Sequence, residues 1–96
     1  MNILDFIPIG KDHPVKREAL MSVMRLPDRE IRAMIEQERR NGHIIINLQD
    51  GRGYYRPAES DFESIMYQYR QNKSRAMSVL VQQKYLRRAL KAAGQL

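Results

Sequence analysis

The pattern of hydrophobic and polar positions divides the chain into short helical segments, one hairpin and one long helix. Residues 2–7 form a short apolar opening, ended by Pro8 and Gly10, that suits one or two turns of helix. A second helix is expected to begin at Pro14, because proline fits the first helical position, and to end near Met24. Its inward face should carry the apolar residues that recur at helical spacing, namely Ala19, Leu20, Val23 and Met24.

A break at Pro27 separates this segment from a third helix. Proline disfavours helical geometry at the preceding Leu26, so the new helix should begin at Pro27 or Asp28. Its narrow apolar stripe consists of Ile31, Met34 and Ile35. The pair Asn41-Gly42 predicts a left-handed stop at the end of this helix.

The stretch "HIIINLQDGRGYYRP", residues 43–57, predicts a β-hairpin. A β-branched run, an Asp-Gly pair and an aromatic restart indicate two strands joined by a five-residue connection, Gln49 to Gly53. The apolar residues expected to anchor this hairpin on the core are Ile44, Ile46 and Leu48. Strand alternation places Tyr54 and Tyr55 on opposite faces, one in the core and one on the surface.

The last segment predicts a helix from about Asp61 to Ala93, capped at Ser60 with Glu63 three residues later. Positions alternately four and three apart form a heptad-like seam of Ile65, Tyr69, Asn72, Ala76, Val79, Gln83, Leu86, Leu90 and Ala93. At a rise of ~1.5 Å per residue this helix would be roughly 50 Å long, more than the rest of the chain can cover. A break near residues 72–74, folding the helix back, is the alternative.

A second copy of the chain is the simplest partner for a helix of that length. The residues expected to form a homodimer interface are Ile65, Tyr69, Ala76, Val79, Leu86 and Leu90. The fold class expected from the whole pattern is mainly α with a small β-hairpin, followed by a long C-terminal helix.

Composition also indicates a class of partner. The 96 residues are enough for one domain, and a net charge of +6 favours a polyanion such as nucleic acid. From residue 68 to residue 96 there are seven Lys and Arg residues and no Asp or Glu. This basic C-terminal face has three interpretations: a solvated helix surface, an arm that contacts phosphates, or a binding surface for an acidic partner protein.

Several function classes are disfavoured. The chain has no cysteine, which removes disulfides and Cys-based metal sites and favours the cytoplasm. No run approaches the ~18 apolar residues of a membrane span. His13 and His43 lack ligand partners at metal spacing, and no arrangement of residues suggests catalysis. We therefore expect no enzyme, no metal, no cofactor and no small-molecule substrate.

Two short helices around a tight break, followed by a hairpin, follow the order of a winged helix-turn-helix. The stretch "VKREALMSVMRLPDREIRAMIEQERRNGHIIINLQDGRGYY" resembles the small winged-helix proteins encoded by bacterial phages and prophages. The most specific pieces are "DREIR", "IEQERRNG" and "GRGYY", and the match covers most of residues 2–57. The resemblance implies a winged helix-turn-helix domain over residues 1–57 and a long basic helix, the expected dimerisation element, over residues 58–96.

Two positions depart from the family pattern. Pro27 stands where family members have a serine that forms a capping box with the glutamate at Glu30. Arg25 replaces the turn glycine, so it must adopt a left-handed conformation or reshape the turn.

The resemblance further implies that residues 28–41 are the recognition helix of a sequence-specific double-stranded DNA-binding protein, acting in phage transcription control or replication. The residues expected at DNA are Arg29, Arg32, Ala33, Glu36 and Arg40 on that helix and Arg52 at the wing tip. The alternative is that these side chains do not bind DNA and form only the solvated face of the helix, with ion pairs such as Arg32–Glu36. The runner-up function is a winged-helix protein-interaction module without DNA binding.

Overall fold

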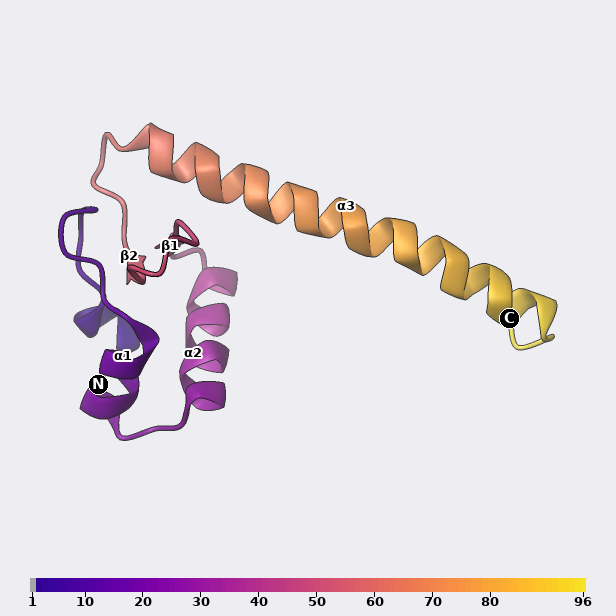
Figure 1. Cartoon of the computed structure of the whole chain (residues 1–96), viewed down its shortest axis with the longest axis horizontal. Coiled ribbons are helices and arrows are strands. Elements are labelled where there is room, and N and C mark those ends of the chain that lie inside the picture. The colour runs from indigo at the N-terminus through magenta and orange to yellow at the C-terminus, as the bar shows by residue number, and fades with distance from the viewer. Residues whose placement is uncertain (1) are drawn as a thin grey trace.

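The computed structural model describes residues 2–96 and is mainly helical, with one small hairpin (Figure 1). The elements in chain order are a 3-10 helix η1 (Ile3–Phe6), α1 (Arg17–Met24), α2 (Asp28–Arg40), β1 (Ile46–Asn47), β2 (Tyr54–Tyr55) and α3 (Phe62–Ala92). The first five elements form a small globular part, and α3 begins beside the hairpin and then runs away from it. The molecule is therefore elongated, with extents of 51 × 32 × 24 Å.

The helix α1 begins at Arg17, not at Pro14 as the sequence indicated. The preceding residues are extended because Val15 pairs with Tyr54 of β2, the two exchanging N–H···O bonds of 2.8 and 2.7 Å. The same close approach explains Gly53, where an added Cβ would lie 2.1 Å from the Val15 carbonyl oxygen. Pro14 thus leads into a rung of the hairpin rather than into a helix.

The inward face of α1 also differs from the expected one. Leu20 is fully buried, with Met21 and Met24 packed beside it, whereas Ala19 and Val23 are exposed. The short helix contacts η1 and α2 through one narrow side. At about 100° per residue, Ala19 and Val23 fall on the other side.

The turn between α1 and α2 confirms one of the two expectations for Arg25. Arg25 has φ 56° and ψ 44°, a left-handed conformation, and the break lies at Leu26 as expected. The helix α2 begins at Asp28 after Pro27, and Ile31 and Ile35 are buried on its inner side. The helix ends at a left-handed Gly42, with φ 97°.

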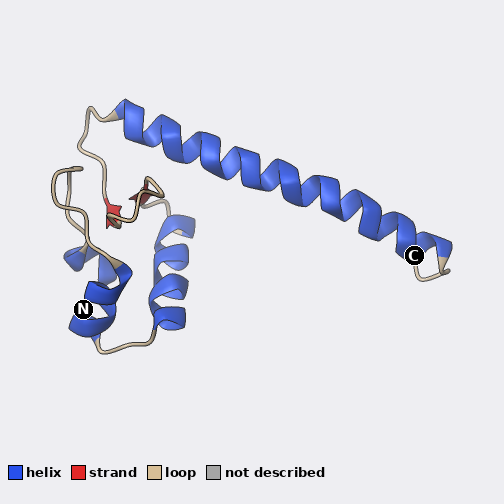
Figure 2. Cartoon of the chain, in the orientation of Figure 1, coloured by secondary structure: helices blue, strands red, loops and turns tan. Residues whose placement is uncertain are grey.

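The hairpin contains the only two strands among residues 2–96 (Figure 2). The strands are antiparallel and pair Ile46 with Tyr55 and Asn47 with Tyr54. Both tyrosines are buried, which corrects the expectation that one would lie on the surface. Tyr54 belongs to the core formed with the short helices, and α3 covers the side on which Tyr55 lies.

Ile45, not Ile44, anchors the start of the hairpin in the core. Ile44 is 47% exposed, whereas Ile45 and Ile46 are 1% and 0% exposed. Regular strand pairing begins only at Ile46, so the alternation of faces does not extend back to residue 44. Leu48, the third expected anchor, is half-buried.

The helix α3 is continuous, which excludes the fold-back near residues 72–74. Its N-cap is Asp61 rather than Ser60, because the Asp61 carboxylate accepts the backbone N–H of Ser64 at 3.2 Å. Only the first turns of α3 are packed against the rest of the chain, through the buried polar residues Ser64 and Gln68. No helix within residues 2–96 is long and apolar enough to cross a membrane.

Three hydrogen bonds attach α3 to the hairpin. The Ser64 hydroxyl donates to Asp61 at 2.6 Å, so its contact of 2.6 Å with Tyr55 requires the tyrosine hydroxyl to donate. The Gln68 side chain accepts the Asn47 backbone N–H at 3.0 Å. The Tyr67 hydroxyl donates to the Leu48 carbonyl at 2.8 Å. We call this set of contacts the α3 clamp.

The left-handed Arg25 makes a testable stability prediction. A non-glycine residue in this region costs about 1–2 kcal/mol, and glycine recovers most of that cost. Arg25→Gly is therefore expected to raise the free energy of unfolding by about 0.5–1 kcal/mol in chemical denaturation. Gly42→Ala is the matched control, since its Cβ would meet nothing and only its φ of 97° opposes it, so it should destabilise. An Arg25→Gly protein less stable than the parent would contradict this reading.

The Asp61 cap makes a prediction about pH. Hydrogen bonds from the Ser64 hydroxyl and backbone N–H lower the pKa of Asp61 below its ordinary value. A carboxylate with a lowered pKa stabilises the fold above its ordinary pKa, and this contribution is lost as pH falls through the lowered value. Asp61→Asn should therefore be less stable than the parent at neutral pH, and the difference should shrink in acid. Thermal unfolding at neutral and strongly acidic pH, with Glu59→Gln as control, measures this.

Candidate nucleic-acid interface

The outer face of α2 is the first part of the candidate interface. Ile31 and Ile35 hold the helix against the core at 0% and 2% exposure. The residues expected at DNA from this helix are all exposed, namely Arg29, Arg32, Ala33, Glu36 and Arg40. The structure thus brings these five side chains onto the solvent side of one helix. Four of them are long and charged, and Ala33 is the one small apolar side chain among them.

Local ion pairs engage three of the expected arginines. Arg32 Nε lies 3.1 Å from Asp28, Arg40 Nε lies 3.5 Å from Glu36, and Arg52 Nε lies 3.6 Å from Asp50. The pairing of Arg32 with Glu36 that the sequence suggested is not formed, because Arg32 and Arg40 each reach the carboxylate four residues before them. Exposed pairs of this kind are worth only about 0.2–1 kcal/mol, so an incoming phosphate or base can replace the carboxylate.

Asp28 joins the two helices of this face. Its carboxylate accepts Arg17 Nε of α1 at 2.6 Å on one oxygen and pairs with Arg32 on the other. Arg17 also reaches the Tyr54 hydroxyl at 3.4 Å, and the hydrogen bonds to Tyr54 and then Asp28 raise the pKa of Arg17. This contact orients the start of α2, which has no side-chain cap at Pro27.

Arg39 differs from its neighbours on α2 because it points inward. Its Nε and Nη2 donate to the Ile45 carbonyl oxygen at 3.3 and 2.9 Å, and burial lowers its pKa. The residue ties the end of α2 to the start of the hairpin. Nothing in the spacing of Arg39 along the sequence indicated this contact.

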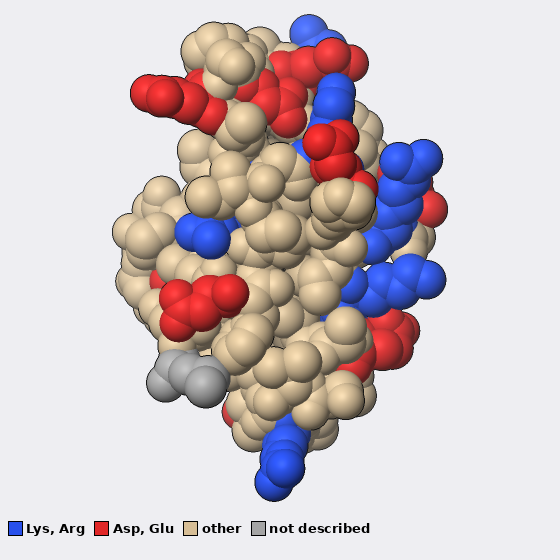
Figure 3. Space-filling model, turned by 90° about the vertical axis from the view of Figure 1, so that its left-hand side faces the viewer, with Lys and Arg blue, Asp and Glu red and all other residues tan. Residues whose placement is uncertain are grey.

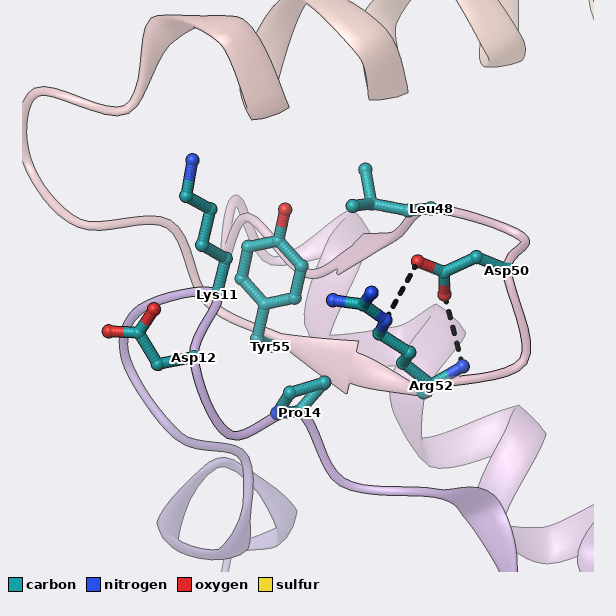
Figure 4. A pocket seen from close by; sticks show the side chains of 8 residues that line it. Lys11, Asp12, Pro14, Leu48, Asp50, Arg52 and Tyr55 are labelled. Carbon is teal, nitrogen blue, oxygen red and sulfur yellow. Dashed lines mark hydrogen bonds and ion pairs between the residues drawn. The ribbon is translucent and has the colours of Figure 1, made fainter.

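The tip of the hairpin contributes Arg52, which is exposed. Asp50 accepts the Arg52 backbone N–H at 3.0 Å and pairs with its guanidinium, so the turn is held by its own side chains (Figure 4). Beside it lies a pocket of about 230 Å³. Its lining residues are Lys11, Asp12, Pro14, Leu48, Asp50, Arg52, Gly53 and Tyr55. Lysine and arginine are matched there by two aspartates, so the pocket has no net charge.

The electrostatic character of the globular part is balanced. Its end remote from the tip of α3 shows Lys and Arg side chains interspersed with Asp and Glu (Figure 3). Residues 1–67 contain 10 of the 17 basic residues and all 11 acidic residues, a formal charge of −1. Sequence-independent attraction for a polyanion therefore does not come from this part as a whole.

The expected dimerisation residues lie along α3 and are not brought into contact with the globular part, apart from Ile65. Ile65 is half-buried beside the α3 clamp. The remaining expected residues, Tyr69, Ala76, Val79, Leu86 and Leu90, are exposed. The clamp uses the side of the helix that carries Ser64, Tyr67 and Gln68, and this side overlaps the seam, since Leu86 follows Gln68 by five full turns. Sequence reasoning missed this side because polar residues seldom indicate burial.

Within residues 2–96, no group of three or more His, Asp or Glu side chains is arranged to hold a metal ion. The surface described above consists of arginines, carboxylates and one alanine. Such groups act by hydrogen bonding and charge, which is the chemistry of groove and phosphate recognition.

The two arginines at the end of α2 allow a matched test of this geometry. Arg39→Ala removes two donors from the Ile45 carbonyl and should lower the free energy of unfolding by roughly 1.5–3 kcal/mol, the range for hydrogen bonds to charged groups. Arg40→Ala, on the exposed side, should stay within about 0.5 kcal/mol of the parent. Urea unfolding followed by circular dichroism measures both. Equal effects from the two substitutions would contradict the inward role of Arg39.

Known families, curated proteins and solved structures provide no relative from which the interface could be inferred. No family model matches the chain, and no curated protein and no solved structure is significantly similar to it. The assignment therefore depends on the side chains and contacts described here.

Proposed function

We propose that this protein is a winged helix-turn-helix protein that binds double-stranded DNA sequence-specifically, as a phage or prophage transcription regulator or replication accessory protein. The observation that carries the proposal is the outer face of α2. Its inner side is buried through Ile31 and Ile35, while Arg29, Arg32 and Ala33 are exposed near its N-terminal half. In helix-turn-helix proteins this part of the second helix enters the major groove.

The order of elements supports the same proposal. A tight left-handed turn joins α1 to α2, and a two-stranded hairpin follows α2. Val15 adds an extended rung to the hairpin just before α1. In a winged helix-turn-helix protein the tip of the wing lies near the DNA backbone, which supports a phosphate or minor-groove contact for Arg52 as part of the proposal.

The chemistry of base reading follows from the ion pairs. When α2 enters a groove, Arg32 exchanges the Asp28 carboxylate for the O6 and N7 acceptors of a guanine. Arg29 forms no ion pair within residues 2–96, so it needs no such exchange. Glu36 suits the amino group of a cytosine, and Ala33 allows the helix to approach the bases closely.

A homodimer through α3 completes the proposal. The seam positions Tyr69, Ala76, Val79, Leu86 and Leu90 are exposed and uncharged, and the interruptions in the seam are also uncharged. Two copies would bury these side chains against each other and present two copies of α2 to two half-sites.

A second candidate function is protein interaction without DNA binding. Two observations favour it. Arg32, Arg40 and Arg52 already form ion pairs with carboxylates, and the globular part has a slightly negative formal charge. DNA-binding measurements separate the two candidates, because a protein-interaction module has no salt-sensitive affinity for duplex DNA.

Arg32→Ala tests the reading helix. It should weaken binding to a duplex selected from a random library by about 1–3 kcal/mol, the range for one lost base contact. Arg75→Ala, which removes the same charge from an exposed position on α3, is the control and should leave this affinity nearly unchanged. Fluorescence anisotropy measures both. Arg32→Ala binding as tightly as the parent would refute the role of α2.

Substitution in the seam tests the dimer. Val79→Glu/Leu86→Glu introduces like charges where the two helices would meet and should convert a dimer to a monomer. Ser74→Glu/Ser78→Glu adds the same charge on another side of α3 and should leave the dimer intact. Size-exclusion chromatography with light scattering gives the mass, and a parent that is monomeric at all concentrations would contradict the interface.

A further inference from the structure

The distribution of charge assigns nearly all of the polyanion attraction to α3. Residues 1–67 carry a formal charge of −1, whereas residues 68–96 carry seven basic residues and no acidic one. Those residues belong to α3 and the few residues after it, and this is the part of the helix that extends beyond the globular part. If only α2 bound DNA, the part of the protein that carries its net positive charge would therefore make no contact with the DNA.

Six of the seven basic residues lie along one side of α3. At about 100° per residue, they fall within an arc of roughly 100°, and we call them the basic stripe: Arg70, Lys73, Lys84, Arg87, Arg88 and Lys91. The centre of this arc is nearly opposite Ser64 and Gln68, which dock on the hairpin. The seventh basic residue, Arg75, lies on the docking side of the helix. The α3 clamp therefore directs the basic stripe away from the globular part, except at Arg70, which lines a pocket with Lys11 and Leu48.

The basic stripe is free to bind. All six residues are exposed, and none takes part in an ion pair within the part of the chain that the structure describes. This differs from α2, where two of the arginines are paired with carboxylates. Toward the end of α3, one shallow groove is lined by Leu80, Gln83, Lys84, Arg87, Arg88 and Lys91. The guanidinium of Arg88 lies 5.7 Å from the centre of the Tyr85 ring, which restricts its freedom before binding.

We propose that the basic stripe is a second DNA-contacting surface that binds the phosphate backbone of double-stranded DNA. This inference rests on the proposed function for its ligand, but it assigns a different element and a different kind of contact. The stripe supplies affinity that does not depend on sequence, and α2 supplies sequence reading. Arg70 and Lys91 are separated by about 32 Å along the helix, a length that suits a linear polyanion.

The surroundings of the stripe favour DNA over a membrane. A helix that lies on a lipid surface needs a broad apolar face opposite its basic face. Opposite this stripe, the first turns of α3 present the buried polar residues Ser64 and Gln68 to the hairpin, and Arg75 and Gln82 follow on the same side. The seam residues Val79 and Leu86 also fall on this side, but Arg75 and Gln82 interrupt them, so no broad apolar face forms opposite the stripe.

The salt dependence of binding to random-sequence duplex DNA tests the proposal. Each phosphate contact contributes about 0.9 to the slope of log affinity against log salt concentration. Lys84→Gln/Lys91→Gln should therefore reduce the slope by about 1.8, so that between about 50 and about 200 mM salt the parent loses roughly tenfold more affinity than the variant. Lys11→Gln/Arg75→Gln, which makes the same change in net charge away from the stripe, is the matched control and should leave the slope unchanged.

The outcomes separate this proposal from the role of α2. Circular dichroism first checks that each variant keeps the helical content of the parent. Equal slopes for the stripe variant and the parent, or equal reductions in the stripe variant and its control, overturn the proposal. Binding to vesicles of anionic lipid with no binding to duplex DNA also overturns it. A parallel Arg29→Ala/Arg32→Ala variant tests α2 alone. If this variant binds DNA as tightly as the parent while the stripe variant still shows a reduced salt slope, only the role of α2 as the reading helix is refuted.

Discussion

The α3 clamp is the interaction on which the position and orientation of α3 depend. Tyr55 donates to Ser64, Ser64 donates to Asp61, and Gln68 accepts the backbone N–H of Asn47. These bonds are directional and partly buried, so they set the rotation of a 31-residue helix about its own axis as well as its position. An apolar contact of the same size would permit more rotation. The clamp thereby decides which side of α3 faces the hairpin and which sides remain for partners.

In the proposed function α2 and α3 have different roles, because their charge environments differ. On α2 the arginines alternate with carboxylates, so the helix has exposed hydrogen-bonding groups but little net field. On α3 the basic residues have no acidic neighbours after Glu63, and their field adds up along the helix. Base reading needs the first arrangement, because discrimination comes from matched donors and acceptors. Attraction to phosphates needs the second, because it depends on charge alone.

The candidate interface could be predicted only in part from the sequence. The exposure of Arg29, Arg32 and Ala33 follows from the apolar stripe of Ile31 and Ile35, since a helix with one buried side exposes the other. The partners of the arginines do not follow from spacing. Arg32 chooses Asp28 over Glu36, both four residues away, and Arg39 turns inward to a carbonyl that lies beyond the end of its helix. Only the packed positions of α1, α2 and the hairpin decide between such alternatives.

By itself, the sequence determined the number and kind of elements, because these follow from local signals. Periodicity, the proline at position 27, the left-handed stop at Gly42 and the Asp-Gly turn each act over a few residues. The tertiary structure alone decided that Val15 joins the hairpin, that Ile45 replaces Ile44 in the core and that both tyrosines are buried. Each of these depends on a segment far away in the chain. Polar residues such as Ser64 and Gln68 carry no hydrophobic pattern, so their burial becomes visible only when their hydrogen-bond partners are in place.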